Sequence, residues 1–325
     1  MSNLTSVICL CYQHERFVRI ALESVYAQST FDWELIIVDD ASTDKSVEEI
    51  NKFLKEKQKL NPPQHIVFLN NKINLGNCKS FNLALSHSKG KYVIDLSADD
   101  ILLPNRIKSQ VNIFETLPSN YGVIFSNAML IKENGKKIAP HFPVDFEDKT
   151  IENVPNGDVY AHILRKYFVC TPTMMMRMSV LQELGGYDED LSYEDFDFWV
   201  RSARNYHYHY QDEITTQKRK TLNSLSSKFY KKKNNAHLES TLKVCKKSLI
   251  QNKTQLENEA LSQTVAYHFR QSFFMQHYVL AKEYLVFWKL IPNVKVPLWA
   301  KFIGFLAKYR VPTFGLYAVY RWFKS

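Results

Sequence analysis

Residues 35–44 read LIIVDDASTD and residues 92–100 read YVIDLSADD, so two short apolar runs each lead into a cluster of carboxylates. Short apolar runs of this kind are typical of buried strands in a mostly parallel sheet. In open α/β sheets, ligands bind at the carboxyl ends of the strands. Two acidic clusters at that edge would converge and favour a divalent metal that carries a phosphate group. The alternative is that they cap helices and turns, which suits Ser42 and Asp44 better than adjacent carboxylates that occur twice.

The rest of the chain predicts an α/β protein with a helical extension. We expect strands at residues 6–11, 35–39, 66–69, 92–96, 123–131 and 174–177, and helices at 17–28, 46–59, 79–88, after Pro104, at 180–184 and at 195–205. The alternation over the first 131 residues predicts a doubly wound, mostly parallel sheet. Residues 132–165 read as an irregular excursion with an Asn134-Gly135 turn at its start. Helical spacing resumes at about residue 236, which predicts a C-terminal helical extension.

Charge divides the chain unevenly. The net charge is +9, but residues 1–213 carry −7 and residues 214–325 carry +16. We therefore expect an acidic catalytic domain at 1–235 and a basic, aromatic-rich helical region at 236–325. The basic region calls for an anionic partner or a solvated surface, and the acidic crevice argues against a nucleic-acid binder.

Location is inferred from what the sequence lacks. The five cysteines are scattered without metal-site spacing, the first residues do not read as a secretory signal, and no apolar run reaches the ~18 residues of a membrane span. These features predict a cytoplasmic protein with reduced thiols.

Four stretches resemble glycosyltransferase family 2, whose members have the GT-A fold, a Rossmann-like nucleotide-binding fold. They are SVICLCYQHERFVRIALESVYAQ (6–28), ELIIVDDASTDKS (34–46), NLGNCKSFNLALSHSKGKYVIDLSADD (74–100) and LGGYDEDLSYEDFDFWVR (184–201). The resemblance implies transfer of a sugar from a nucleotide donor with a divalent metal, Mg²⁺ or Mn²⁺. It also implies a nucleotide-sugar half at about 1–131 and an acceptor half at about 132–235.

The resemblance assigns donor-binding roles to residues at the strand ends. Tyr12 would stack on the base, and Asp40 would accept from a ring N–H, which suits uracil, thymine or guanine and favours a UDP-sugar. Asp39 would orient the loop or contact the ribose. Asp99 would contact ribose or metal, and Asp100 would be the principal metal ligand, because the usual first aspartate of the motif is replaced by Ser97.

Basic residues near these strand ends are phosphate candidates. Lys79 is the main one, although Phe81 stands where many relatives have an arginine. His14 and Arg16 could also touch phosphate, and Arg219 is a weak candidate for the same role.

The fourth stretch supplies the catalytic and acceptor residues. An inverting transfer needs a carboxylate that takes the proton of the acceptor hydroxyl, and the Glu194-Asp195 pair matches the family at this place, with Asp195 as the base. Weaker candidates for acceptor binding are Tyr193, Trp199 and Gly186.

Other protein classes remain as alternatives. A nicotinamide dehydrogenase needs a glycine-rich turn after the first strand, and residues 9–20 contain no glycine. A sugar-nucleotide pyrophosphorylase would share the sheet and metal chemistry but needs a glycine- and basic-rich loop early in the chain. A non-catalytic glycan- or nucleotide-binding module with a degenerate GT-A site also fits.

Residues 284–325 mix aromatic and aliphatic residues with lysine and arginine. This composition suits a helix that lies in the membrane interface, and packing on the catalytic domain or on a partner subunit is the alternative. We therefore predict a peripheral protein on the inner face of the membrane. As the resemblance implies, it would extend a lipid-linked glycan acceptor in the synthesis of a bacterial surface polysaccharide.

Overall fold

The computed structural model describes residues 4–58, 65–221, 229–230, 236–313 and 315. The chain forms two compact units. The first, the sheet unit, contains residues 1–158, 169–190 and 205–221. The second, the helical unit, contains residues 159–168, 191–204 and 222–325. The division differs from the predicted boundary at residue 235, because two short segments within the predicted catalytic domain group with the C-terminal helices.

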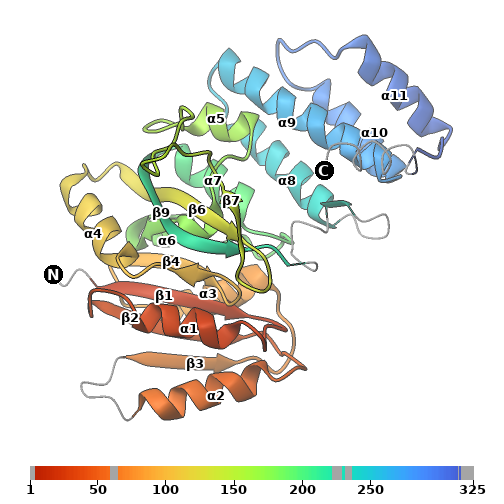
Figure 1. The fold of residues 1–325 in the computed structure, drawn as a ribbon. Helices are drawn as coiled ribbons and strands as arrows, with labels where there is room; N and C mark the ends of the chain where they lie inside the picture. The colour runs from red at the N-terminus through yellow and green to blue at the C-terminus, as the bar shows by residue number, and fades with distance from the viewer. Residues whose placement is uncertain (1–3, 59–64, 222–228, 231–235, 314, 316–325) are drawn as a thin grey trace. The chain divides into compact units, whose positions relative to one another are not determined.

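The sheet unit is built on one sheet, which follows the order β3-β2-β1-β4-β8-β6-β9-β5 with β7 paired to β6 (Figure 1). Strands β3, β2, β1 and β4 are parallel neighbours, and β8 joins β4 and β6 by antiparallel pairing. Its described strands are β1 (Thr5–Cys11), β2 (Trp33–Asp39), β3 (Ile66–Asn70), β4 (Tyr92–Ser97), β5 (Ile101–Leu102), β6 (Tyr121–Ile131), β7 (Lys137–Pro140), β8 (Met175–Arg177) and β9 (His207–Arg219).

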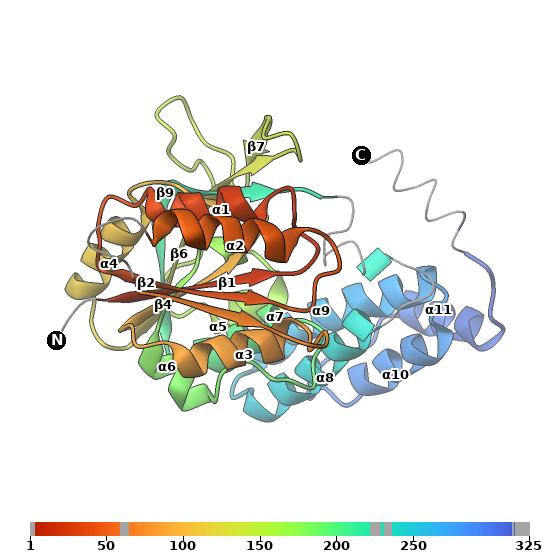
Figure 2. The same ribbon diagram turned by 90° about the horizontal axis from the view of Figure 1, so that it is seen from below.

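Helices cover both faces of this sheet, as a doubly wound fold requires. Helices α1 and α2 lie on one face, and α3 and α6 lie on the other (Figure 2). The core beneath α1 and α2 is apolar, and Val7, Leu35, Ile37 and Ile94 are fully buried in it. The described helices of this unit are α1 (Val18–Tyr26), α2 (Ser46–Lys57), α3 (Asn77–His87), α4 (Arg106–Thr116), the 3₁₀ turn η1 (Thr171–Thr173) and α6 (Met178–Leu184).

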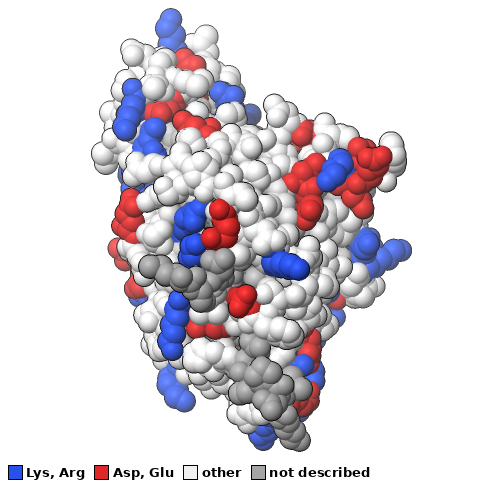
Figure 3. All heavy atoms as spheres, turned by 90° about the vertical axis from the view of Figure 1, so that its left-hand side faces the viewer, with Lys and Arg blue, Asp and Glu red and all other residues white. Residues whose placement is uncertain are grey.

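The side at which the parallel strands begin carries charged side chains of both signs. There, acidic and basic side chains are interspersed among uncharged ones (Figure 3). The carboxylate clusters found in the sequence belong to the opposite ends of the strands, where β2 and β4 finish.

The predicted α/β class with a C-terminal helical region is confirmed, and the predicted strands and helices of the first 131 residues are present within a few residues. The predicted turn at Asn134-Gly135 joins β6 to β7, with Gly135 N–H donating to Lys132 O at 2.9 Å. The main omission is β9, which runs beside β6 for most of its length.

The helical unit consists of helices packed on one another. Its longest helix, α9, begins with a capping box in which the Thr254 side chain accepts from Glu257 N–H and the Glu257 carboxylate accepts from Thr254 N–H. In the described part of the chain no helix is both long and apolar enough to cross a bilayer. The described helices of this unit are α5 (Tyr160–Arg165), α7 (Asp195–Ala203), α8 (Ala236–Gln251), α9 (Gln255–Phe274), α10 (Tyr278–Trp288) and α11 (Leu298–Lys308).

Candidate functional site

The carboxyl ends of β1, β2 and β4 are aligned by backbone hydrogen bonds. Asp40 N–H donates to Cys11 O at 2.9 Å, and Ala98 N–H donates to Leu10 O at 2.9 Å. The residues that follow the three strands therefore emerge at one edge of the sheet. This alignment brings the regions of Tyr12, Asp39 and Asp99 together, as expected for neighbouring parallel strands.

The loop after β1 holds Tyr12 outward. Gln13 takes a positive φ of 60°, and its N–H donates to Ser42 Oγ at 2.9 Å. Glu15 N–H donates to Asp44 Oδ2 at 3.0 Å. Ser42 and Asp44 thus serve as local caps, and they fasten the loop while Tyr12 keeps 47% of its surface exposed. An exposed flat ring at this position is free to stack on a base.

The two carboxylates after β2 have different surroundings. Asp40 accepts hydrogen bonds from Leu75 N–H at 2.8 Å, Gly76 N–H at 2.9 Å and Asn71 Nδ2 at 2.8 Å. Asp39 accepts from Ser42 N–H through Oδ1, whereas its buried Oδ2 has no hydrogen-bond partner among the described residues. An unpaired buried acceptor is costly, so it marks a place where a donor from a ligand would be stabilising. Asp40 therefore organises its loop, whereas Asp39 keeps an unused acceptor position on a fully buried side chain.

The cysteine beside this pair adds no charge. Burial, with a smaller contribution from the charge of Asp39, raises the pKa of the Cys11 thiol to about 12. The thiol therefore stays protonated near neutral pH.

The two carboxylates after β4 also differ. Asp100 is buried, and its Oδ1 accepts Arg219 N–H at 2.7 Å. Burial and then the neighbouring charge of Asp99 raise the pKa of Asp100 well above its usual range. The Asp99 side chain remains 13% exposed, with Oδ1 accepting the Ser97 hydroxyl at 2.5 Å and Oδ2 at 4.0 Å from His14 Nε2. Of the two, Asp99 is the more accessible to a ligand.

Arg219 is an internal brace of this corner. Its Nε donates to Asp99 O at 2.9 Å, and its Nη1 donates to the carbonyls of Lys132 and Glu133. The guanidinium also lies over the Phe17 ring, 4.6 Å from the centroid. These contacts use most of its donors, so the weak assignment of Arg219 to phosphate is not favoured by the geometry.

The residues at this edge fit a hard divalent cation only partly. Within the described residues no group of three or more His, Cys, Asp or Glu side chains could hold a metal by itself. Magnesium is commonly held by one or two carboxylates together with phosphates of the substrate and water. Asp99, whose side chain is 13% exposed, fits that pattern better than Asp100, which is buried and accepts a backbone N–H.

The predicted phosphate contacts are placed unequally. Lys79 is exposed in the first turn of α3. Phe81, which occupies the usual arginine position, is fully buried and stacks on Tyr187 with ring centroids 4.0 Å apart. Arg16 pairs with Glu133 at 2.9 Å. Lys79 therefore stays a candidate for the phosphate contact, whereas Phe81 belongs to the core.

Gly186, predicted at the acceptor site, has a close packing contact instead. A Cβ at this residue would lie 2.4 Å from Asn82 Oδ1, and its φ is 76°. Asn82 Oδ1 accepts Tyr187 N–H at 2.9 Å, and Asn82 Nδ2 donates to Tyr187 O at 2.8 Å. Asp95 accepts the Tyr187 hydroxyl at 3.0 Å. Gly186 thus permits a clamp between α3 and the 187–190 loop, a role that the sequence analysis did not foresee.

In the helical unit, the predicted base stands at the start of α7. Glu194 and Asp197 are buried, whereas Asp195 is partly exposed. The Asp197 carboxylate is held by Arg201 Nε at 2.6 Å and Lys247 Nζ at 2.7 Å. Because Asp197 is neutralised and enclosed, Asp195 is the carboxylate of this segment best able to meet an acceptor hydroxyl.

The aromatic residues beside Asp195 are packed. Tyr193 is 6% exposed, and its hydroxyl lies 2.6 Å from Thr241 Oγ1. Trp199 is 3% exposed, with its ring 5.9 Å from that of Tyr167. Burial raises the pKa of Tyr193 far above its usual range. Both side chains belong to the interior of the helical unit, so their predicted contact with an acceptor is not favoured.

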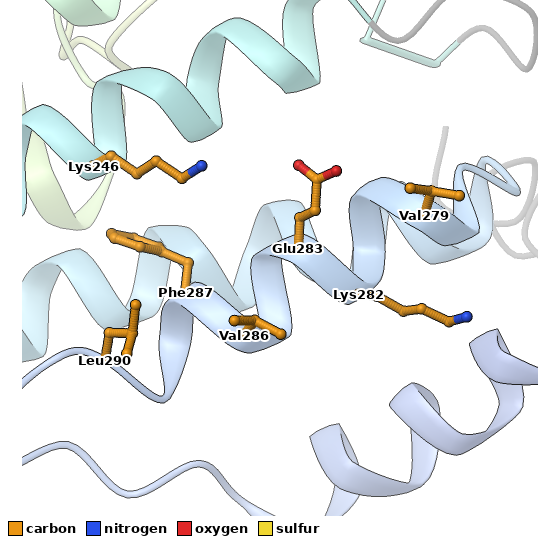
Figure 4. A pocket seen from close by; sticks show the side chains of 7 residues that line it. All are labelled: Lys246, Val279, Lys282, Glu283, Val286, Phe287 and Leu290. Carbon is orange, nitrogen blue, oxygen red and sulfur yellow. The ribbon is translucent and has the colours of Figure 1, made fainter.

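A separate groove of about 470 Å³ lies within the helical unit between α8 and α10 (Figure 4). Val286, Phe287 and Leu290 supply much of its apolar lining, and Lys246 and Glu283 extend toward one another across it. Glu283 is its sole acidic residue among the described lining, so the groove lacks the paired carboxylates expected of a transfer site.

Comparison with known proteins decides the family. The model of glycosyl transferase family 2 matches residues 6–185, which is more than half of the chain. The chain belongs to this family. An uncharacterized glycosyltransferase of Methanocaldococcus jannaschii is 32% identical over 204 residues, covering 62% of this chain and 65% of the relative. The Escherichia coli UDP-Glc:α-D-GlcNAc-diphosphoundecaprenol β-1,3-glucosyltransferase WfgD is 29% identical over 140 residues, covering 42% of this chain and 51% of WfgD.

The fold of this family 2 enzyme is GT-A. S. aureus TarS (residues 1–349), solved with UDP-GlcNAc, matches with a TM-score of 0.68 and 17% identity, covering 94% of this chain and 88% of that chain. The chain spans about two thirds of the length of the first curated relatives, 65% in each of two cases. Membership of the family argues against the pyrophosphorylase and dehydrogenase alternatives, and the relatives named above are glycosyltransferases.

Proposed function

We propose that this glycosyltransferase moves a sugar from a UDP-sugar to a lipid-linked glycan acceptor, with inversion at the anomeric carbon, in the synthesis of a bacterial surface polysaccharide. The observation that carries the proposal is the set of strand-end groups in the sheet unit: exposed Tyr12, Asp39 with an unpaired oxygen, and accessible Asp99. These groups supply a stacking ring, an acceptor for a ring N–H and a metal ligand.

Uracil is the base that suits these groups well. Its N3–H could donate to Asp39 Oδ2, which accepts from no described residue, provided that binding uncovers this buried side chain, and its ring could stack on Tyr12. Adenine has no ring N–H to donate. The UDP-GlcNAc bound by TarS and the UDP-glucose named for WfgD support the same choice.

Asp99 would hold a magnesium or manganese ion, with Asp100 and Arg219 keeping its loop in place. When bound, such an ion would neutralise negative charge on the departing nucleotide diphosphate. Lys79 would add a positive charge near the phosphates. Asp100, the ligand first expected from the sequence, would support Asp99 from the interior.

Asp195 would act as the general base. As the first residue of α7 it is held at a helix start, and its neighbour Asp197 is already paired with Arg201 and Lys247. The Asp195 carboxylate would take the proton of the acceptor hydroxyl while that oxygen attacks the anomeric carbon. Attack on the face opposite the leaving nucleotide gives inversion.

The acceptor is proposed from chemistry shared with a relative and from the basic helices. WfgD acts on a sugar carried by diphosphoundecaprenol. Residues 214–325 carry a net charge of +16, which suits work at an anionic membrane surface. The protein would then be peripheral on the inner face of the membrane.

The test is a panel of sugar nucleotides, each assayed for hydrolysis with and without Mg²⁺ or Mn²⁺, together with nucleotide binding by calorimetry. We expect UDP-sugars to be preferred and Asp99→Asn to lower the rate at least 100-fold, since a metal contributes several kcal/mol. Asp32→Asn, which changes an exposed carboxylate elsewhere in the sheet unit, is the matched control.

Two results would contradict the proposal. Full activity in excess chelator would contradict the requirement for a metal. Retention of the donor's anomeric configuration, measured by NMR on the product, would contradict inversion. Binding of UDP without any turnover would favour a non-catalytic binding module. This is the second candidate, because Ser97 and Phe81 stand where many relatives have an aspartate and an arginine.

A further inference from the structure

Helix α11 packs on its own unit through small residues. Ala300 and Ala307 are fully buried, one heptad apart. A Cβ added to Gly304 would lie 2.4 Å from Leu285 Cδ2 of α10. Small residues on this side let α11 approach α10 closely, so the larger side chains of α11 must point elsewhere.

The opposite side of α11 is a stripe of large apolar residues that remain in solvent. They follow the spacing i, i+4, i+7 and i+11, which places them on one face of a helix. Their exposed fractions are high for apolar side chains, at 80% for Leu298, 62% for Phe302, 56% for Phe305 and 61% for Tyr309. A contiguous exposed apolar row of this kind normally marks a surface for a membrane or a partner.

Charge around the stripe is strongly positive. Residues 278–313 contain six lysine or arginine residues and one acidic residue, Glu283. Lys301, Lys308 and Arg310 are exposed on α11 and directly after it. Large apolar residues together with lysines and arginines match an interfacial helix on anionic lipid better than a protein interface, because charged residues, and lysine in particular, are depleted from interface cores.

Helix α10 does not share this property along its whole length. Tyr284, Phe287 and Trp288 are buried, and Trp288 Nε1 donates to Ser262 Oγ at 2.7 Å. The membrane segment predicted from the sequence at 284–325 therefore separates into a structural helix, α10, and a surface helix, α11. Residues 316–325 of that prediction lie outside the described residues.

We propose that the stripe Leu298, Phe302, Phe305 and Tyr309 inserts into the headgroup region of an anionic bilayer. Lys301, Lys308 and Arg310 would then contact lipid phosphates. The proposal deepens the proposed function, since an enzyme that extends a lipid-linked glycan must reach the membrane surface. The helix would lie parallel to the surface, with its small-residue face on α10.

The test is flotation of the full-length protein with vesicles of phosphatidylcholine alone and with 30 mol% phosphatidylglycerol, at low and high salt. We expect binding to anionic vesicles at low salt that weakens as salt screens the lysines. Phe302→Ser with Phe305→Ser should lower the partition coefficient about 100-fold, because each buried phenylalanine contributes roughly 1.5 kcal/mol or more. Lys301→Gln with Lys308→Gln should lower it about 30-fold, at ~1 kcal/mol for each charge.

Matched controls use two phenylalanines of the sheet unit that are more exposed than Phe302 and Phe305. Phe31 and Phe146 are 77% and 94% exposed, and Phe31→Ser with Phe146→Ser should bind vesicles like the wild type. Circular dichroism and thermal melting verify that each variant folds. Hydrolysis of the UDP-sugar, measured on the same samples, separates failure of this proposal from failure of the proposed function.

Three outcomes overturn the proposal. The first is absence of binding to anionic vesicles at low salt. The second is wild-type binding by the Phe302/Phe305 double variant. The third is a stable dimer, seen by sedimentation velocity, that this double variant converts to a monomer, because the stripe would then be covered by a second copy.

Discussion

Replacing Asp40 by asparagine separates a structural carboxylate from a ligand-binding one. The substitution keeps the shape of the side chain but replaces one acceptor oxygen by an NH₂ group. In the native loop, Asp40 Oδ1 accepts from Asn71 Nδ2 and Leu75 N–H, and Oδ2 accepts from Gly76 N–H. The amide oxygen can still accept the two hydrogen bonds made by Oδ1. The NH₂ group then takes the place of Oδ2 and faces Gly76 N–H, which is itself a donor.

The size of the effect follows from these three contacts. Hydrogen bonds to a charged acceptor contribute about 1.5–3 kcal/mol each, and neutral ones about 1 kcal/mol. One contact is lost and two become neutral, so with charged bonds at about 1.5–2 kcal/mol each, Asp40→Asn should lower the free energy of unfolding by about 2.5–4 kcal/mol. For a domain of this size that corresponds to a fall in Tm of roughly 5–15 °C.

Asp39→Asn is the matched comparison at the adjacent residue. Its amide oxygen can still accept Ser42 N–H, so stability should change by less than about 1 kcal/mol. Its NH₂ group would face the ring N–H of uracil, so affinity for UDP should fall by roughly 10–100-fold. Urea denaturation and calorimetric titration with UDP measure the two effects separately.

The reasoning is refuted if the two variants exchange behaviour. An Asp40→Asn protein with unchanged stability and lost UDP affinity would restore the base contact that the sequence predicted for Asp40. Equal stability losses in both variants would show that Asp39 also has a structural role.

Three further predictions concern packing, pH and thiol reactivity. Gly186→Ala should lower the free energy of unfolding by about 2–4 kcal/mol, because a positive φ and the 2.4 Å approach to Asn82 both oppose a side chain. Gly185→Ala, with φ 70° and open space around it, should lower it by only about 1 kcal/mol. Urea denaturation of both variants measures the difference. Burial alone would raise the pKa of Glu257, but hydrogen bonds from Lys253 N–H and Arg204 lower it below its usual value. The ionised Glu257 therefore stabilises the fold above about pH 4.5, and this contribution is lost as the pH falls through the folded-state pKa. The difference in unfolding free energy between wild type and Glu257→Gln should therefore shrink from pH 7 to pH 3.5. All five cysteines are buried, so Ellman's reagent at pH 8 should label the native protein slowly and all five thiols after unfolding, and rapid native labelling would contradict their burial.

The parallel half of the sheet was predictable because its sequence signals are local. Strands β1, β2 and β4 are apolar runs, and their amphipathic neighbours α1 and α2 bury one face each. Strand β9 was missed for a physical reason. Its sequence, HYHYQDEITTQKR, is mostly polar. It forms a strand because it pairs along β6, which lies far away in the sequence, so the local pattern of residues does not reveal this partner.

The positions of the strand-end carboxylates were predictable from the sequence, but the surroundings of each carboxylate were not. The sequence located the strand-end carboxylates at 39–40 and 99–100, since these follow recognisable strands. Which member of each pair is held by a distant segment depends on groups far along the chain. Asp40 is engaged by Leu75 and Gly76, and Asp100 by Arg219 at the end of the unrecognised strand. Without β9, no sequence argument could have shown that Asp100 is buried.

The same logic applies to the pairs in both loops and suggests a common arrangement. In each pair, one carboxylate accepts a backbone N–H from a segment far along the chain, whereas the other accepts, among the described residues, only a local hydrogen bond, through Oδ1. Asp40 and Asp100 hold the 71–76 loop and the end of β9, while Asp39 Oδ2 and Asp99 Oδ2 make no hydrogen bond to a described residue within the same loops. A binding carboxylate gains from a rigid neighbour, because a fixed group loses little entropy when the ligand binds. The proposed roles therefore predict that substitution of the supporting member by glutamate or asparagine lowers stability most, whereas the same substitution of the proposed binding member lowers affinity most.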